Sequence, residues 1–359
     1  MRNIHITLVG GQPSPVHAGI KYINPDEIVF ICSEQTYEDA EKIKKMYSSI
    51  ECKIETINPN HLGKIHKKVI EIYERYKDSN ISINLTSGTK SWSLILYEVF
   101  ANTEAKIILV DQNGRIWDFR EKTSLIYETQ MEELFIKGTP DNFIKFEDFS
   151  NEDKQVIKDI EELIVYSHDD FFRLVNNARS NSDRTEINLN NGDYLKWDKL
   201  SKTFTMKIGK KIKKLFSKHV RGILLNTGWF EYKVASLLYN CDLIQDIWMN
   251  CIFKYKNDAP KNEFDIVAFT GNKLLFVECK NQIGDNTDID KFAEAARNFG
   301  GMGCKRLFVT NEKMKPNAKE KCKDNDVLFL CLADYETFGE QLMALSKLLN
   351  LEMNTSNAK

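Results

Sequence analysis

Residues 1–140 alternate regularly between strand-like and helix-like segments, and this alternation limits the possible folds more than any other feature. Short apolar runs typical of strands lie at 3–9, 27–33, 52–58, 81–85 and 106–111. Amphipathic segments typical of helices lie between them, at 35–48, 61–77 and 90–102. Strand followed by helix, repeated, predicts an α/β fold with a mostly parallel, Rossmann-like sheet and helices on both faces. In such sheets, ligands bind beyond the carboxyl ends of the strands.

The next segment, 141–205, is more polar and predicts a small connector domain. Its pattern indicates two helices, at about 151–165 and 168–179, followed by a hairpin across 185–198. Two helices and a hairpin would suit a winged-helix-like connector.

From residue 206 the pattern changes again and predicts a third domain, 206–359. The stretch "MKIGKKIKKLFSKHVRGIL" (206–224) suggests an amphipathic helix, with apolar residues on one face and lysines on the other. The elements expected after it are a helix at 228–239, a strand at 242–256, a hairpin at 263–280, a helix at 288–299 and a strand at 305–310. This order is α-β-β-β-α-β, and residues 315–350 would add covering helices and a strand at 327–332.

Composition excludes several classes of protein. The net charge is −2, so no global basic field indicates nucleic acid, and no run of 18 apolar residues predicts a membrane span. The eight cysteines are scattered without a CxxC pair, which argues against a disulfide framework and a zinc ribbon. We therefore expect reduced thiols and a cytoplasmic protein with no membrane partner.

The stretch "EFDIVAFTGNKLLFVECKN" (263–281) places charges where two apolar strands end together. Gly271-Asn272 predicts a two-residue hairpin turn. In that register Asp265 faces Glu278 and Glu263 faces Lys280, and the side chains of all four project from one face. An exposed hairpin with charged ends is the simpler interpretation of any one of them.

Two carboxylates on opposed strand positions repel each other unless something lies between them. A divalent cation satisfies both, and hard oxygen ligands suit Mg²⁺ or Mn²⁺. Lys280 is then placed to contact a bound water or a phosphate. Glu231, on an apolar helix stripe, is a candidate third ligand, although a half-exposed glutamate at a helix start is the alternative.

Two loops at strand-to-helix junctions predict a site for an anionic, phosphate-bearing ligand. They are "GGQPSP" (10–15) and "NLTSGTKSW" (84–92). Neither is a dinucleotide fingerprint or a P-loop. Such loops direct backbone N–H groups and the positive end of a helix dipole above the sheet. Ordinary helix capping explains the Ser and Thr residues equally well, but not the glycine pair of the first loop.

The acidic constellation resembles the signature of PD-(D/E)xK nucleases, and residues 222–312 resemble their core. The matching positions are Glu231, Asp265 and Glu278-Cys279-Lys280, with Phe264 in place of the motif's proline. The resemblance implies phosphodiester hydrolysis with one or two divalent metals. Glu263 is an additional acid, and we expect it to hydrogen-bond and orient Lys280.

The two loops resemble the ligand loops of CARF domains, which sense cyclic oligoadenylates in type III CRISPR defence. Together with the nuclease motif, the chain resembles CRISPR ancillary nucleases of the Card and Can type. This resemblance implies a homodimer whose two CARF domains form one site for cyclic tetra-adenylate. The residues expected to line that site are Gly10, Gly11, Gln12, Pro13, Thr86, Ser87, Gly88, Thr89 and Lys90, with Ser33 and Gln35 as further candidates.

The resemblance therefore implies an antiviral nuclease activated by a cyclic oligoadenylate, acting on DNA, RNA or both. Seven basic residues between Lys207 and Arg221, and Lys291 and Arg297 further on, are candidates for contacts with substrate phosphates. One alternative is a restriction or repair nuclease with another regulatory ligand. Another is a non-catalytic regulator that reads DNA through the connector.

Overall fold

The computed structural model describes residues 1–355, apart from 112–113, 182–183, 255–259, 282–286 and 302. The chain forms two compact units. The first comprises Met1–Thr139, Phe269–Leu275 and Lys291–Arg306, and the second comprises the remaining segments. Among the described residues, no helix combines the length and apolar character that a membrane span requires. All eight cysteines are free thiols, as predicted.

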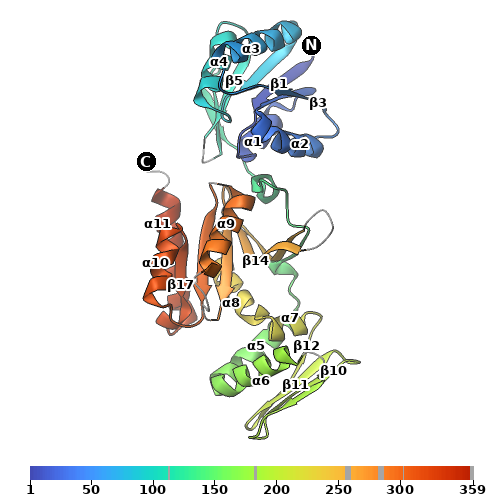
Figure 1. Ribbon diagram of the computed structural model, residues 1–359, viewed down its shortest axis with the longest axis vertical. Helices are drawn as coiled ribbons and strands as arrows, with labels where there is room; N and C mark the ends of the chain where they lie inside the picture. The colour runs from blue at the N-terminus through green and yellow to red at the C-terminus, as the bar shows by residue number, and fades with distance from the viewer. Residues whose placement is uncertain (112–113, 182–183, 255–259, 282–286, 302, 356–359) are drawn as a thin grey trace. The chain divides into compact units, whose positions relative to one another are not determined.

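The first unit contains a seven-stranded sheet in the order β3-β2-β1-β4-β5-β6-β7 (Figure 1). Its strands are β1 (Asn3–Leu8), β2 (Glu27–Cys32), β3 (Glu51–Thr56), β4 (Asn80–Asn84), β5 (Lys106–Val110), β6 (Arg115–Asp118) and β7 (Thr123–Ile126). The strands from β3 to β5 are parallel, and β6 and β7 are added antiparallel at one edge. The predicted parallel sheet is confirmed, and the two edge strands are additional.

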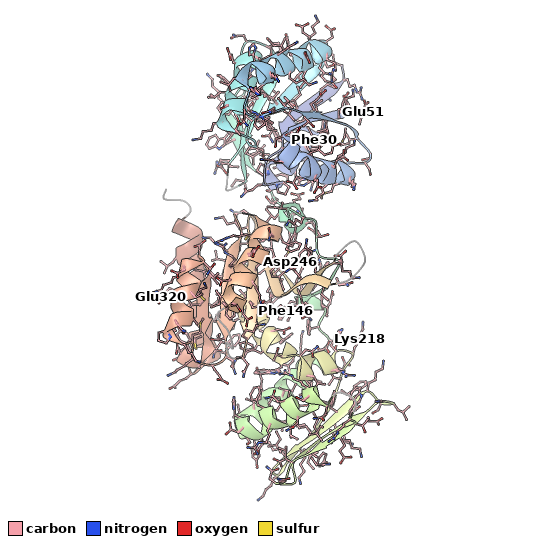
Figure 2. The ribbon with its side chains drawn as sticks, viewed as in Figure 1. Phe30, Glu51, Phe146, Lys218, Asp246 and Glu320 are labelled. Carbon is pink, nitrogen blue, oxygen red and sulfur yellow. The ribbon has the colours of Figure 1, made fainter. Side chains whose placement is uncertain are left out.

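Helices cover both faces of this sheet. They are α1 (Ser14–Ile23), α2 (Tyr37–Met46), α3 (Leu62–Tyr76) and α4 (Lys90–Phe100). Apolar residues of α1 and α2 pack around Phe30, which is labelled in Figure 2, while those of α3 and α4 form a separate core on the opposite face. Because β2 is buried along its whole length, its residues 28–32 are continuously apolar rather than alternating, and the buried Glu27 at its start is paired with Lys53.

Helix α1 is absent from the sequence-based prediction because Pro13 and Pro15 lie at its start and Gly19 lies inside it. The structure gives a reason for that glycine. A Cβ atom at Gly19 would lie 2.5 Å from Asn84 Nδ2 and 3.1 Å from His5 Nε2, so only glycine allows α1 to approach β1 and β4 this closely.

In the second unit, α5 (Asn151–Tyr166) and α6 (His168–Ser180) pack against a four-stranded antiparallel sheet. The sheet has the order β12-β11-β10-β9. Its strands are β9 (Glu186–Asn188), β10 (Tyr194–Asp198), β11 (Thr203–Ile208) and β12 (Lys211–Phe216). The two predicted helices and the β9–β10 hairpin are confirmed.

The predicted helix over 206–224 is wrong. Residues 203–216 form the hairpin β11–β12, with Ile208 paired to Lys211 across a turn in which Gly209 has a φ of +54°. Phe204, Met206 and Ile208 are buried at alternate positions, which is the period of a strand. Only the end of that stretch, from residue 220, is helical, as part of α7 (Val220–Leu225).

The lysines of this stretch therefore do not share a helical face, and several have local partners. Lys213 Nζ lies 2.7 Å from Asp159 Oδ1 and 2.6 Å from Glu162 Oε2. Lys207 donates to Gly192 O, and Lys211 lies over the Tyr166 ring. These contacts weaken the interpretation of the run as a phosphate-binding face.

A six-stranded sheet follows, in the order β17-β16-β15-β14-β13-β8. Its strands are β8 (Asn142–Lys145), β13 (Asp246–Lys254), β14 (Pro260–Phe269), β15 (Leu274–Lys280), β16 (Lys305–Thr310) and β17 (Leu328–Cys331). The remaining helices are α8 (Gly228–Tyr239), α9 (Thr287–Gly300), α10 (Pro316–Asp324) and α11 (Phe338–Thr355). The predicted α-β-β-β-α-β order is confirmed, with β8 as an unpredicted edge strand. Short 3₁₀ turns lie at Glu34–Thr36, Met131–Leu134, Phe146–Asp148 and Leu332–Asp334.

The buried His5 in β1 predicts that acid destabilises the protein. Burial lowers the pKa of His5 to about 3, because its charged form would lie in the sheet core beside Ser82. The unfolded chain takes up this proton below pH 6.5 and the folded chain does not. The contribution of neutral His5 to the free energy of unfolding is therefore fully present above pH 6.5, and it decreases as the pH falls. Between pH 7 and pH 5 the loss from His5 is about 2 kcal/mol.

Urea unfolding of the full chain at pH 7 and pH 5 checks this prediction. His5→Gln should show a smaller loss of unfolding free energy between the two pH values than the wild type. His61→Gln, at an exposed position, is the control and should keep the wild-type difference. Equal pH dependence in His5→Gln and the wild type would contradict the account.

Candidate functional site

The hairpin β14–β15 carries the acidic residues, and its turn has the predicted pairing. Thr270 N–H donates to Lys273 O over 3.1 Å, and Gly271 has a φ of +86°. Counting outward from this pair places Asp265 opposite Glu278. The Cys279 N–H donates to Asp265 Oδ2 over 2.7 Å, which holds the Asp265 side chain beside the residue that follows Glu278.

Near the open end of the hairpin, the two faces differ in burial. Phe264, Ile266, Val277 and Cys279 are buried, whereas Asp265, Glu278 and Lys280 are half-buried. Since side chains alternate along a strand, burying the apolar set forces the charged set onto the opposite side. The acids therefore occupy one face because the core requires the other.

Helix α8 supplies the third acid. Glu231 lies in its first turn and is 7% exposed, among the buried residues Phe230, Val234 and Ala235. Thr227, the residue before the helix, has a φ of +65°, and its hydroxyl donates to Glu231 Oε1 over 3.4 Å. The alternative of a half-exposed glutamate at a helix start does not hold.

The carboxylates destabilise one another's charged forms. Burial raises the pKa of Glu231 to about 7, and the charges of Glu263 and Glu278 add to this shift. Burial, Glu278 and Glu231 raise the pKa of Asp265 well above its usual range. Burial also raises the pKa of Glu278, although Lys280 opposes that shift. Mutual repulsion of this kind requires that the acids lie close together.

Lys280 is the cation within this group. Its Nζ lies 2.6 Å from Glu278 Oε1. Burial alone would lower the pKa of Lys280, but the charges of Glu278 and Asp265 raise it above its ordinary value. Lys280 therefore stays charged, and its described ion pair is with Glu278. Glu263 is exposed, and its predicted role of orienting Lys280 stays a prediction.

The donor set suits a hard divalent cation, because buried carboxylates that repel one another are stabilised by a shared positive ion. Glu231, Asp265 and Glu278 do not lie in the arrangement of three ligands around one ion. Among the described residues, no group of three or more acidic, histidine or cysteine side chains has the arrangement of a metal site. Asp265 and Glu278 are thus the central pair, with Glu231 beside them.

In the first unit, a cavity of about 490 Å³ lies at the carboxyl ends of the parallel strands. Its lining includes most of the predicted ligand residues: Gly10, Gly11, Gln12, Ser33, Gln35, Thr86, Ser87, Gly88 and Thr89. Pro13 lines a smaller neighbouring cavity of about 290 Å³ with Gly10 and Gly11. Lys90 is exposed at the first position of α4.

The hydrogen bonds of the two loops show which hydroxyl groups have structural roles. Thr86 Oγ1 donates to Asn84 Oδ1 and accepts from the Val110 N–H, so it ties β4 to β5. Thr89 Oγ1 accepts from the Trp92 N–H as the N-cap of α4. Trp92 lines the cavity, and among the described residues its buried indole N–H has no hydrogen-bond partner, which leaves a donor for a ligand.

Two family models match the chain. The Card1 CARF domain matches residues 4–137, and the endonuclease domain of the Card1-like proteins matches residues 218–329. The first range contains the cavity, and the second contains Glu231, Asp265, Glu278 and Lys280.

The chain belongs to the Card1-like CARF nucleases. Its CARF domain is the Rossmann-like sheet, and its endonuclease domain is the α/β region around β13–β16. No curated protein sequence matches this Card1-like chain.

Solved structures share the fold of the Card1-like chain. Can2 from Sulfobacillus thermosulfidooxidans, solved in complex with cyclic tetra-adenylate, is 18% identical with a TM-score of 0.69, over 97% of this chain and 98% of that chain. Protein VC1899 from Vibrio cholerae is 16% identical with a TM-score of 0.74, over 96% and 97%. A type III CRISPR defence DNA nuclease activated by cyclic oligoadenylate is 18% identical with a TM-score of 0.55, and the match covers 94% of this chain but 49% of that one.

Sequence reasoning missed several residues of the CARF cavity, namely Thr36, Pro59, Trp92 and Asp111. Asp111 could have been found, because it directly follows β5 and so lies at the same edge of the sheet as the glycine loops. Trp92 could not, because nothing in an apolar helix shows which residue faces the ligand.

The conformation of Gly88 in this Card1-like chain predicts a specific sensitivity. Its φ is +84°, and a Cβ atom there would lie 3.3 Å from Leu8 Cδ1. Gly88→Ala should therefore lower the unfolding free energy by roughly 1–2 kcal/mol. Gly63→Ala is the control, since nothing lies within 4 Å of its Cβ position and it is helical. Thermal unfolding should show a loss for the first variant only, and equal midpoints would contradict this reading.

Proposed function

We propose that this protein is a divalent-metal-dependent nuclease of type III CRISPR defence, activated when cyclic tetra-adenylate binds its CARF domain. The observation that carries the proposal is the presence of both family matches in one chain, each over the residues of one candidate site. Two structural relatives agree with it. One is a complex with cyclic tetra-adenylate, and the other is a nuclease activated by cyclic oligoadenylate.

The acidic residues have distinct roles in this proposal. Asp265 and Glu278 hold Mg²⁺ or Mn²⁺, with Glu231 assisting. The ion, when bound, polarises the scissile phosphate and lowers the pKa of a water. Asp265 is oriented by the Cys279 N–H, which fixes one of its oxygens. Lys280 directs its ammonium group at the charge that develops on the phosphate, and Glu263 helps to orient Lys280.

The ligand site requires two chains in this proposal. A cyclic tetra-adenylate ring has two-fold symmetry, and an isologous dimer presents the same loops to each half of the ring. Each chain contributes the loop of Gly10, Gly11, Gln12 and Pro13 and the loop of Thr86, Ser87, Gly88, Thr89 and Lys90, with Ser33 at the rim. Ligand binding activates by favouring one arrangement of the endonuclease domains, through a higher affinity for that state.

The substitutions Asp265→Asn and Glu278→Gln test the catalytic half. Each should reduce cleavage of plasmid, single-stranded DNA or RNA by at least about a hundredfold with Mn²⁺ and ligand present, because each removes a ligand charge. Each should leave binding of radiolabelled cyclic tetra-adenylate unchanged. Glu320→Gln, at an exposed site on α10, is the control and should cleave like the wild type. Full activity of either active-site variant would refute the assignment.

Lys90→Ala tests the sensor half. Loss of this cation at the N-terminus of α4 should raise the ligand concentration needed for half-maximal cleavage about tenfold, since one charge-assisted contact is worth about 1.5 kcal/mol or more. Lys64→Ala, an exposed lysine of α3, provides the matched loss of charge. An activation curve identical to that of the wild type would exclude Lys90 from the ligand site, and cleavage that needs no cyclic oligoadenylate would favour a restriction or repair nuclease.

A further inference from the structure

A second cavity of about 490 Å³ lies in the described part of the second unit, between α5, α8 and the segment that leads into α11. Its wall is partly aromatic, with Trp229 and Tyr232 from α8 and Phe338 from the start of α11. Trp229 is 3% exposed and forms the floor of the cavity, whereas Phe338 is 44% exposed and lies at its rim. Phe146, labelled in Figure 2, stacks on Tyr232 and holds that ring in place.

Lysines gather along one side of this cavity. Lys154 and Lys158 are exposed and one helical turn apart on α5, so their ammonium groups reach the same side, and Lys233 joins them from α8. Within the described part of the chain, none of the three has an ion pair. Two carboxylates also line the cavity, the half-buried Glu161 and the exposed Glu336. Burial raises the pKa of Glu161, and Lys233 opposes that shift.

A buried acceptor without a partner completes the wall. Gln341 is 6% exposed, and its Nε2 donates to Leu332 O over 3.2 Å and to Tyr335 O over 3.4 Å. Because both partners are carbonyl groups, the amide nitrogen is fixed and the oxygen must be the other atom. That Oε1 has no hydrogen-bond partner among the described residues. A buried acceptor of this kind favours a ligand that brings an N–H group.

The cavity borders the strand end that carries Lys280. Asn311 lines it, and the same residue donates its N–H to Lys280 O over 3.1 Å and its Nδ2 hydrogens to Asn281 Oδ1 over 2.9 Å. On α8, Trp229 and Lys233 lie two residues before and two residues after Glu231, so they project from the opposite side of the helix. A molecule in the cavity is therefore linked to the catalytic hairpin through Asn311, and α8 separates it from Glu231.

We propose that this cavity binds one nucleotide of the substrate strand, outside the nucleotides at the scissile bond. The base lies against the aromatic floor under Phe338 and gives an N–H to Gln341 Oε1, while the neighbouring phosphates contact Lys154, Lys158 and Lys233. Apolar walls, convergent cations and one free acceptor match the chemistry of a nucleotide. The inference rests on the proposed nuclease function, because it assigns a subsite to that substrate.

Binding of fluorescent single-stranded DNA and RNA 20-mers tests the lysine wall. The Asp265→Asn chain with Mg²⁺ and cyclic tetra-adenylate keeps the strand intact during fluorescence anisotropy. Adding Lys154→Ala and Lys158→Ala should weaken binding and lower the slope of log affinity against log salt by about 1.4, since each phosphate contact contributes about 0.7. Lys199→Ala with Lys323→Ala removes the same charge at exposed sites and should leave the slope unchanged.

Phe338→Ala tests the base. It should weaken binding of the same 20-mers at least about fivefold, the equivalent of one lost stacking contact. For a 20-mer of abasic residues, the variant and its parent should bind equally. In the active chain, Phe338→Ala should raise KM and leave kcat unchanged, whereas a merely structural role would lower both kcat and the unfolding midpoint.

The outcomes separate this inference from the proposed function. If the chain with Asp265 intact cleaves nucleic acid but the lysine pair and Phe338 variants bind and cleave like their controls, the subsite is refuted. A preference for DNA or for RNA that disappears in Phe338→Ala would support the subsite and identify the substrate. If no nucleic acid is cleaved under any condition, the proposed function fails, and the anisotropy series still decides whether the cavity binds a strand.

Discussion

Three carboxyl groups share a largely buried region with one ammonium group, and this imbalance of charge governs the chemistry of the endonuclease domain. Burial raises the pKa values of Glu231, Asp265 and Glu278, neighbouring carboxylates raise them further, and Lys280 offsets only part of this shift. Buried like charges are strongly destabilising, so a folded protein keeps such a cluster only where a positive charge or protonation offsets the repulsion. In the proposed function, a divalent cation would supply that compensation and, in the same place, the Lewis acid that phosphodiester hydrolysis uses.

The scaffold explains why the acids cannot move apart. The apolar face of β14–β15 holds Phe264 and Cys279 in the core, and strand alternation then fixes Asp265 and Glu278 on the other face. The hydrogen bond from the Cys279 N–H to Asp265 ties one strand to the other across the hairpin. Helix α8 is likewise anchored by buried residues on either side of Glu231, so the third acid stays near the pair.

Much of this arrangement could be predicted from the sequence because its causes are local. A Gly-Asn turn between apolar runs sets a register, and the register sets which side chains share a face. The glycine loops were found for the same reason, since they follow strands of a regular α/β alternation. The failure at 206–216 also has a local cause. Apolar residues at 206, 208, 212 and 215 fit a helix and a strand almost equally, and Gly209 decides between them only by its positive φ.

Other features depend on contacts between distant parts of the chain and are not visible in any local pattern. The cavity beside α8 is lined by Lys158 and Gln341, which lie far apart in sequence, and its unpartnered acceptor follows from where Leu332 and Tyr335 place their carbonyl groups. Edge strands such as β8 are equally hidden, because four residues become a strand only when a partner strand lies beside them.

Titration calorimetry with Mn²⁺ tests the central claim most directly, namely that Asp265 and Glu278 share a cation. The wild-type chain and Glu320→Gln should bind Mn²⁺ with the same affinity and stoichiometry. Asp265→Asn and Glu278→Gln should each lose that binding. Unchanged Mn²⁺ affinity in both of these variants would contradict the account, whatever ligand the CARF cavity holds.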